Sequence, residues 1–247
     1  MNIKISPASK IFLTLLFVYV ILFEFILPIN NILPKPSFII ESFTTIWSDY
    51  NIAISLLETY SIIVFSFLGG YFLCWLFRGL TIYFGEEQKE IFSSFSWLRS
   101  VNIFFVVILV GFWFGDSITA FMIFMMIFQF LGLMNELMKL NKEDEAYQLT
   151  VMSLSSDKNR DMAEIKWKLR IPQIYKSIIE KQSLMWLLVL TYEFIHLDVG
   201  VGYVIKQILA YKDFTGLFPI IIITALLYKL NFLLLKISVK KYAFWRT

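Results

Sequence analysis

The chain has 247 residues, of which 58% are hydrophobic and only 17% are charged, and its formal net charge is +3. A soluble domain of this length must cover its outside with polar groups, so the composition excludes an ordinary soluble protein and requires apolar side chains to face lipid. The apolar runs are long and continuous rather than short and alternating, which favours membrane-spanning helices over a β-barrel. The basic residues cluster beside these runs, and no tract is typical of a nucleic-acid-binding surface.

Six apolar segments follow one another and predict an all-α polytopic bundle, with residues 1–247 forming one transmembrane domain. We place the spans at about 11–29, 52–77, 101–114, 117–138, 182–199 and 216–235. The first is longer than the apolar core of a signal peptide and no small-residue cleavage motif follows it, so we expect it to be retained. The third is short for a full crossing, and it gains the missing length if it begins near Phe92.

The positions of Lys and Arg predict the orientation. With both termini in the cytosol, almost all basic residues between the spans are cytosolic, and only Lys35, Lys206 and Lys212 lie outside. The positive-inside rule requires this distribution and rejects the reverse. We therefore expect a multi-pass protein of a prokaryotic plasma (inner) membrane, surrounded by lipid.

The one large polar insertion, residues 139–181, is then cytosolic and carries charges of both signs. Between residues 161 and 169, apolar side chains including Trp167 stand between charges, which predicts a short, half-buried helix. We expect Pro172 to close or kink this helix. Such a segment needs a surface on which to dock, and the alternative is a solvated linker.

Several polar groups lie in or near the spans, and intramembrane ionisable groups are costly enough to be candidate sites. They are Glu24, Glu58, Gln129, Glu193, His196 and Lys229. The alternative is that each reaches water near the end of its span. A single histidine gives no basis for a metal site, and Cys74 is expected to be a buried packing residue. The chain has no phosphate-binding loop of the G-x-x-x-x-G-K-[ST] type, so a separate subunit would have to bind ATP.

Small residues recur on one face of the second predicted span. Thr59, Ser66 and Gly70 are spaced by seven and four residues, and Ser66 and Gly70 form a small-xxx-small pair. This spacing allows two helix backbones to approach closely, and it is common in membrane proteins of many functions.

Several landmarks occur in an order found in a known family. They are Leu33-Pro34-Lys35-Pro36-Ser37 after the first span, the small-residue face of the second, Trp113-Phe114-Gly115 at the end of the third, and Glu193 followed seven residues later by Gly200-Val201-Gly202-Tyr203. In this order the chain resembles the permease subunits of ATP-binding-cassette (ABC) importers, in the branch of nitrate, sulfonate and taurine permeases. The resemblance covers nearly the whole chain, from about residue 32 to residue 245.

The cytosolic loop departs from the signature of that family, which is E-A-A-x3-G followed after about a dozen residues by an apolar residue and Pro. Ile171-Pro172 matches the end of the signature. Glu145-Ala146 matches its start, but Val151 then occupies the glycine position and the interval to Pro172 is too long. Counting back from Pro172 instead puts Asn159 at the glycine position, where Asn tolerates the left-handed conformation of a turn. The two registers remain open.

The resemblance implies a type I importer permease that couples to a cytosolic ABC ATPase. The residues implied to contact the ATPase are Glu145, Ala146, Ser155, Ser156, Asp157, Asn159, Ile171 and Pro172. Those implied to form the translocation path or gate are Thr59, Ser66, Gly70, Trp113, Phe114, Gly115, Glu193, Gly200 and Gly202, with the last two glycines in a tight outer turn. The ATPase would bind ATP and Mg²⁺, so this chain needs no cofactor, metal or catalytic residue and is not itself an enzyme.

The resemblance also implies a periplasmic or lipid-anchored substrate-binding protein and a second permease copy, usually in a homodimer, with a heterodimer as the alternative. The substrate class would be a small solute of the nitrate, sulfonate, taurine or vitamin-precursor type. Two other functions stay open. The departures in the loop suggest a membrane partner that has lost coupling, and Glu193, His196 and Asp198 are the nearest approach to the site of a membrane-embedded enzyme.

Overall fold

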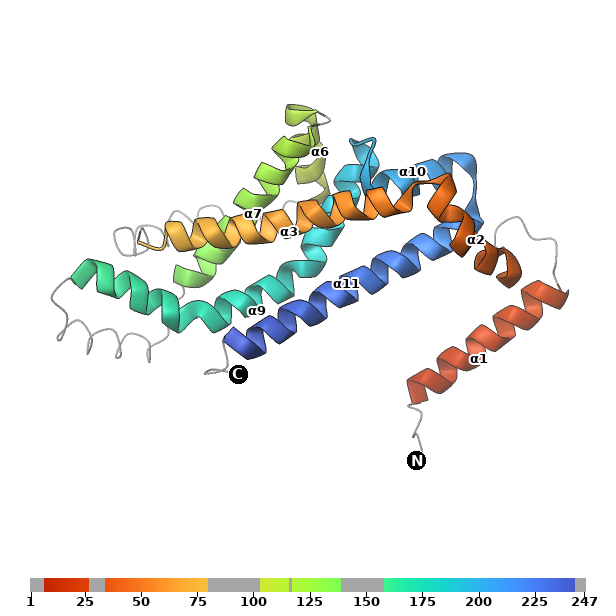
Figure 1. The fold of residues 1–247 in the computed structure, drawn as a ribbon, viewed down its shortest axis with the longest axis horizontal. Coiled ribbons are helices and arrows are strands. Elements are labelled where there is room, and N and C mark those ends of the chain that lie inside the picture. The colour runs from red at the N-terminus through yellow and green to blue at the C-terminus, as the bar shows by residue number, and fades with distance from the viewer. Residues whose placement is uncertain (1–6, 27–33, 80–102, 116, 139–157, 243–247) are drawn as a thin grey trace.

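The computed structural model describes residues 7–26, 34–79, 103–115, 117–138 and 158–242, and these parts are all-α (Figure 1). The chain begins with α1 (Pro7–Ile21), which continues into the π-helical turn η1 (Leu22–Ile26). The remaining helices are α2 (Pro36–Asp49), α3 (Ile52–Leu76), α6 (Ile103–Phe114), α7 (Ile118–Met138), α9 (Lys158–Ile195), α10 (Gly200–Tyr211) and α11 (Phe214–Tyr242). The expected all-α class is confirmed for these residues.

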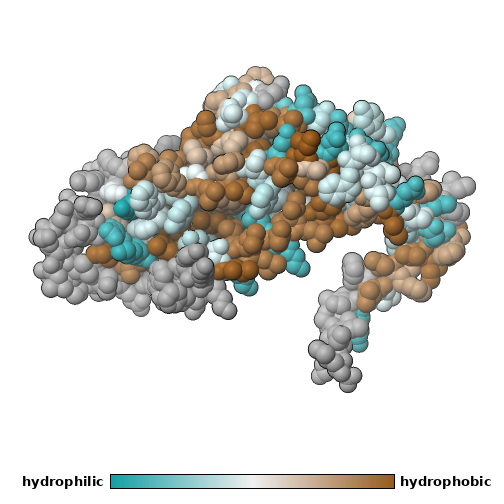
Figure 2. All heavy atoms as spheres, in the orientation of Figure 1, coloured by the Kyte–Doolittle hydropathy of each residue, from teal (hydrophilic) through white to brown (hydrophobic). Residues whose placement is uncertain are grey.

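Three described helices are long and apolar enough to cross a membrane, namely Ile52–Leu76 in α3, Ile118–Leu137 in α7 and Phe214–Val239 in α11. The α9–α10 pair, bent by 50° at a short break, adds a fourth if it is counted as one span. The apolar helices at the first and third predicted spans are shorter, and both predictions extend beyond the described residues. Figure 2 shows hydrophobic residues along α3 and α11, with hydrophilic residues near α10. The chain is therefore a multi-pass membrane protein with three or four such helices in its described parts.

Two buried clusters hold the helices together. The larger one joins α3, α6, α7 and α9, where the rings of Phe121 and Tyr192 stack with centroids 3.7 Å apart and an interplanar angle of 4°. The smaller cluster joins α2, α3, α10 and α11 around Ile46 and Ile208, which are 1% and 0% exposed. Because the side chains of these clusters are buried against one another, close packing and aromatic contact fix the positions of α3 and α9.

Helix α1 lies apart from the main group of helices in Figure 1. Leu15 and Phe17 on α1 are 65% and 64% exposed, as expected for side chains that face lipid. Its end is tied to α2 by two hydrogen bonds. The Tyr19 hydroxyl donates to the carbonyl of Pro34 at 2.6 Å, and the Ser37 amide donates to Glu24 Oε2 at 3.3 Å. Glu24 thus binds a free amide in the first turn of α2, next to Pro36 at the helix start.

The structure corrects the prediction for the polar insertion. The helix expected around residues 161–169 is present but much longer than predicted: residues 158–181 form the first part of α9, a helix of 38 residues that continues through Pro172 into the following span. Of the two effects expected of Pro172, closing the helix is wrong, because α9 continues through it, whereas Figure 1 shows a bent α9, which agrees with the alternative of a kink. A proline inside a helix removes one backbone hydrogen bond, which bends a helix but does not end it when tertiary packing supports both sides.

The buried face of this part of α9 includes basic as well as apolar residues. Trp167 is buried as predicted, with 6% exposure, and its ring lies 5.5 Å from that of Tyr71 on α3. The other buried positions are Ala163, Lys166 and Arg170, whereas Ile165 and Leu169 are only partly buried. These buried positions are spaced by three to four residues, as on one side of an α-helix, although some of them carry basic side chains. Long basic side chains can be buried there because their aliphatic stems pack against apolar neighbours.

Two sharp turns bring α2 and α11 together. Asn51, between α2 and α3, has φ of 49°, and Lys212, between α10 and α11, has φ of 58°. Asp213 caps α11, since its Oδ1 accepts hydrogen bonds from the Thr215 hydroxyl and the Gly216 amide, while Tyr50 donates to its Oδ2 at 3.1 Å. Burial acts to raise the pKa of Asp213, but these hydrogen bonds outweigh it and the pKa lies below its ordinary value. Burial, followed by the Asp213 charge, raises the pKa of Tyr50 to about 12.

We expect Asp213→Ala to lower the free energy of unfolding by about 1 kcal/mol, because a helix N-cap and a link to α2 are lost. The contribution of Asp213 is fully present above the ordinary aspartate pKa of about 3.9 and is lost as the pH falls through the lower value of the folded protein. Thermal unfolding in detergent at several pH values measures both effects. Asp49→Ala is the matched control, since Asp49 is exposed and caps no helix; equal loss in both variants would contradict the capping role.

Candidate functional site

The candidate site is the break between α9 and α10. Helix α9 ends at Ile195, and α10 begins at Gly200, which has φ of +88°. A side chain at Gly200 would be strained by this φ, and its Cβ would lie 2.3 Å from the carboxyl carbon of Glu193. The sequence therefore places glycine at the point where the chain must turn directly above a buried carboxylate.

Side chains from α3 and α9 bind the first three amides of α10. The Gly200 amide donates to Glu58 Oε2 at 3.1 Å, the Val201 amide donates to Thr59 Oγ1 at 2.9 Å, and the Gly202 amide donates to Glu193 Oε2 at 2.9 Å. These are the amides that a helix N-terminus leaves without an internal partner. The N-cap residue, Val199, has an apolar side chain and cannot accept a hydrogen bond, so α10 is capped by other helices.

Glu193 is the centre of this arrangement and is fully buried, with 0% exposure. The Thr59 hydroxyl oxygen lies 2.8 Å from Oε1 and 2.9 Å from Oε2 of Glu193, and 3.0 Å from the carbonyl of Ser55. A hydroxyl has one proton, so Thr59 donates to one of these acceptors while it accepts from Val201. The Gly202 amide, at the positive end of the α10 dipole, also donates to Glu193. The carboxylate thus joins α3, α9 and α10.

Gly202 does not make the tight turn that the sequence suggested. It lies in the first turn of α10, where a Cβ would come within 2.3 Å of the Leu190 carbonyl oxygen and 2.7 Å of Glu193 Cβ. Its role is to let α10 pack directly on the backbone of α9. Of the two glycines expected in an outer turn, only Gly200 has the positive φ that such a turn requires.

The three small residues of α3 lie on one buried face, as the sequence predicted. Thr59 and Ser66 are each 1% exposed, and Gly70 is buried. Only Thr59 reaches Glu193. Ser66 donates to the carbonyl of Ile62 in its own helix, and a Cβ at Gly70 would lie 2.8 Å from the Gln129 side chain of α7. The face therefore serves two purposes: Thr59 caps α10, and Gly70 allows α3 and α7 to approach closely.

Trp113-Phe114-Gly115 ends α6, as expected. Gly115 has φ of +58°, its amide donates to the Gly111 carbonyl, and its carbonyl accepts the Tyr192 hydroxyl at 2.7 Å. A left-handed glycine after the last helical residue is a common helix C-cap. Trp113 and Phe114 are 76% and 48% exposed. The structure places these two rings on the surface, and Gly115 links the end of α6 to Tyr192 of α9.

Only some of the residues expected to contact an ATPase belong to the described part of the chain. Glu145, Ala146, Ser155, Ser156 and Asp157 lie outside the described residues. The backbone of Asn159 is in the first turn of α9 and is helical, so the expectation of a left-handed turn there is wrong. Ile171 is partly buried and Pro172 is buried within this chain. A helix that starts at Lys158 leaves no turn at Asn159.

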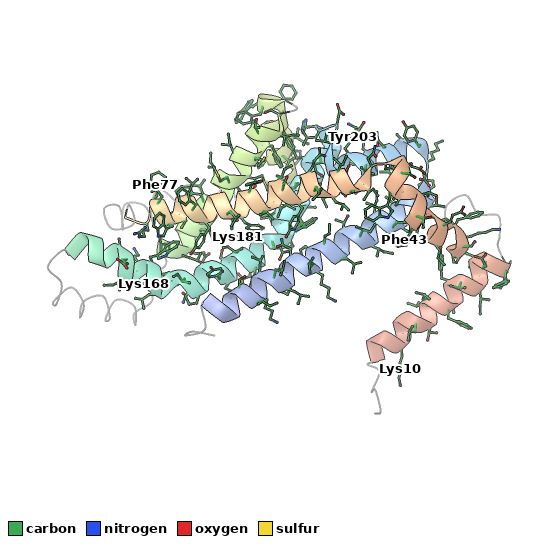
Figure 3. All side chains as sticks on the ribbon, viewed as in Figure 1. Lys10, Phe43, Phe77, Lys168, Lys181 and Tyr203 are labelled. Atoms are coloured by element: carbon green, nitrogen blue, oxygen red, sulfur yellow. The ribbon has the colours of Figure 1, made fainter. Side chains whose placement is uncertain are left out.

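Two features next to the centre were missed by the sequence analysis as parts of one site. Glu58 was considered only as an isolated polar residue, although an acid beside Thr59 in an apolar run was the available signal. The second feature is an open hollow of about 320 Å³ next to Glu58, with three carboxylates on its wall. It is lined by Asp49, Tyr50, Asn51, Ile54, Ser55, Glu58, Asp198, Val199, Tyr203, Val204 and Gln207. Tyr203 is labelled on α10 in Figure 3.

A second polar region lies between α3, α7 and α9. Gln129 is 0% exposed, and neither polar atom of its side chain has a hydrogen-bond partner among the described residues. The Lys181 amine of α9 lies 2.6 Å from where a Cβ at Gly132 of α7 would stand, so Gly132 makes room for it (Figure 3). Gln182 donates to the Tyr228 carbonyl of α11 at 3.1 Å. Polar groups of α9 thus contact two other helices within the bundle.

Comparison with protein-family models, with curated proteins and with solved structures gave no match for this chain. Within the described ranges, no group of three or more His, Cys, Asp or Glu side chains is arranged to hold a metal ion.

We expect Gly200→Ala to destabilise the protein by about 1–3 kcal/mol, because Ala is strained at this φ and its Cβ would displace the Glu193 carboxylate. Thermal unfolding in detergent measures the change. Gly79→Ala is the control, because Gly79 has no positive φ and a Cβ there would have nothing within 4 Å. If the two variants are equally stable, the prediction is wrong, because the turn at residue 200 can then accept a side chain without strain and without displacing Glu193.

We also expect Thr59→Val to cost about 1–3 kcal/mol, because it leaves the buried Val201 amide without its acceptor and removes the Thr59 hydroxyl from Glu193, which keeps the hydrogen bond of the Gly202 amide. Ser61→Ala is its control on the same helix, since the Ser61 hydroxyl bonds only the carbonyl of Glu58 one turn away. A double-mutant cycle of Thr59→Val with Glu193→Gln should give a clearly non-additive result. Additive losses would mean that the two side chains act independently.

Proposed function

We propose that this chain is the transmembrane permease subunit of an ABC importer, with six spans and both termini in the cytosol. The observation that carries the proposal is the Glu193-to-Gly202 segment, which resembles the family pattern and in which each of the three matching residues has a defined contact. Glu193 binds the start of α10, Gly200 makes the turn, and Gly202 packs on α9. The distribution of basic residues supports the orientation.

The length of α9 supports a coupling role. At about 1.5 Å per residue, its 38 residues span roughly 57 Å, whereas the hydrocarbon core of a bilayer is about 30 Å thick. One continuous helix therefore extends from the charged cytosolic segment to the capped break at the other end. A shift imposed on its first turns by an ATPase would be carried to the Glu193 centre, because a packed helix moves as a rigid element.

In this proposal, the cytosolic ATPase subunits bind ATP and Mg²⁺, and a periplasmic or lipid-anchored protein delivers the substrate. Two permease copies would form the path, as a homodimer or with a related partner. The substrate would be a small solute of the nitrate, sulfonate, taurine or vitamin-precursor type. Because Ile171 and Pro172 are largely covered by this chain, the ATPase contact would be made by residues that precede them, between 145 and 159.

The test is purification of the tagged chain from its native membrane in mild detergent, followed by mass spectrometry of the proteins that co-purify. We expect a cytosolic ATPase in near-equal amount, and we expect replacement of residues 157–161 by a Gly/Ser segment to abolish its recovery. The same replacement at residues 243–247 serves as the control and should leave recovery unchanged. Recovery of the chain alone, even after crosslinking in intact membranes, would instead favour a membrane partner that has lost coupling.

A further inference from the structure

We propose that α2 is an interfacial helix, which lies in the membrane boundary next to the α10 end of the bundle and places Ile40, Phe43 and Trp47 in lipid. The proposal rests on the position of α2, on the distribution of its side chains and on the surfaces of the neighbouring spans. It does not depend on transport or on any partner subunit.

The position of α2 is set at both of its ends and along its inner face. Figure 1 shows α2 running across the ends of α3 and α11 rather than along them. The left-handed turn at Asn51 separates α2 from α3, which begins one residue later. The Ser42 hydroxyl lies 2.7 Å from the Ile39 carbonyl of its own helix and 3.1 Å from the Thr215 carbonyl of α11, and Tyr50 donates to Asp213, so α2 is held at the first turn of α11. The helix therefore lies at the level where two long apolar helices begin.

The side chains of α2 divide into three faces. Ser42 and Ile46, which are 7% and 1% exposed, face the bundle. Ile40, Phe43 and Trp47 follow at intervals of three and four residues and form a second, apolar stripe (Phe43 is labelled in Figure 3). Ile40 is 72% exposed, Trp47 is 46% exposed and Phe43 is partly buried. The third face is exposed and mostly polar, with Glu41, Thr44, Thr45 and Ser48, and Phe38, 51% exposed, lies at its edge near the start of the helix.

Lipid is the occupant that fits the apolar stripe. The helices that α2 joins expose apolar side chains near the same end, namely Ile54 and Leu57 of α3 and Ile221 of α11, which are 53–69% exposed. In a membrane protein these surfaces face lipid, and the stripe of α2 extends that surface around the end of the bundle. Trp47 lies five residues before the start of α3, which is the depth where tryptophan is enriched at membrane boundaries. An amphipathic helix that lies in the boundary buries one such face and leaves its polar face in water.

The test uses single nitroxide labels in liposomes of phosphatidylcholine and phosphatidylglycerol. The single cysteine, Cys74, is replaced by Ala, and labels are attached at Ile40→Cys and, as the matched control, at Thr45→Cys on the polar face. We expect collisions of the Ile40 label with oxygen, which concentrates in lipid, to exceed those with a water-soluble nickel chelate by at least threefold. The Thr45 label should show the reverse. Both variants must first match the parent chain in thermal unfolding.

Two outcomes would overturn the proposal. Strong nickel collisions at both positions would place α2 clear of the membrane, and shielding of the Ile40 label from both agents would show that protein covers the stripe. If the Cys74 replacement does not fold, the native chain and its Trp47→Phe variant can be compared in liposomes with lipids brominated either near the headgroup or deep in the acyl chain. The difference in fluorescence between the native chain and the Trp47→Phe variant is the emission of Trp47. We expect this emission to be quenched more by bromine near the headgroup than by bromine deep in the acyl chain. Equal quenching in both lipids would contradict the interfacial position.

Discussion

The N-terminus of α10 is a buried helix start without a cap of its own, and the arrangement of the central helices depends on how its amides are satisfied. Backbone amides left unpaired among apolar side chains each cost several kcal/mol, roughly as much as a protein can spare. Glu58, Thr59 and Glu193 supply the missing acceptors from two different helices. Because each acceptor has to meet a particular amide, α3 and α9 have one register relative to α10.

The packing around this centre keeps the three helices at the required distances. Gly202 lets α10 rest on the α9 backbone, and Gly70 lets α3 approach α7. On the other side of α9, Tyr192 stacks on Phe121 and donates its hydroxyl proton to the carbonyl of Gly115. Small residues give close contact on one side of α9, and aromatic residues fill the space on the other. Glu193 and Tyr192 of α9 are thus held in place by contacts with α10 on one side and with α6 and α7 on the other.

Helix α9 connects this centre with the charged segment at its other end. Buried residues recur along α9 from Tyr192 and Glu193 back to Trp167 near the start of the helix, so a buried stripe runs along almost the whole element. Pro172 lies within that stripe, and packing against α3 and α7 keeps the helix continuous on both sides of it. A mechanical link of this kind is what a permease driven by a separate ATPase would need, and it makes the first turns of α9 the part of the chain where a partner could act on the distant turn.

The sequence by itself determined the features that follow from composition and from local spacing. Apolar runs predicted the helices, Trp113-Phe114-Gly115 indicated the end of the third span, Gly200 was expected in a tight turn, and the interval from Glu193 to Gly202 indicated a functional segment. It did not predict that α9 continues through Asn159 and Pro172, because packing along the 38 residues of this helix outweighs the turn propensity of Asn and the interruption caused by proline. Only the tertiary structure decided that Thr59 and Glu58 cap α10, since residues separated by more than 130 positions meet there. Hydrogen bonds between distant elements depend on helix register, which local residue patterns do not encode.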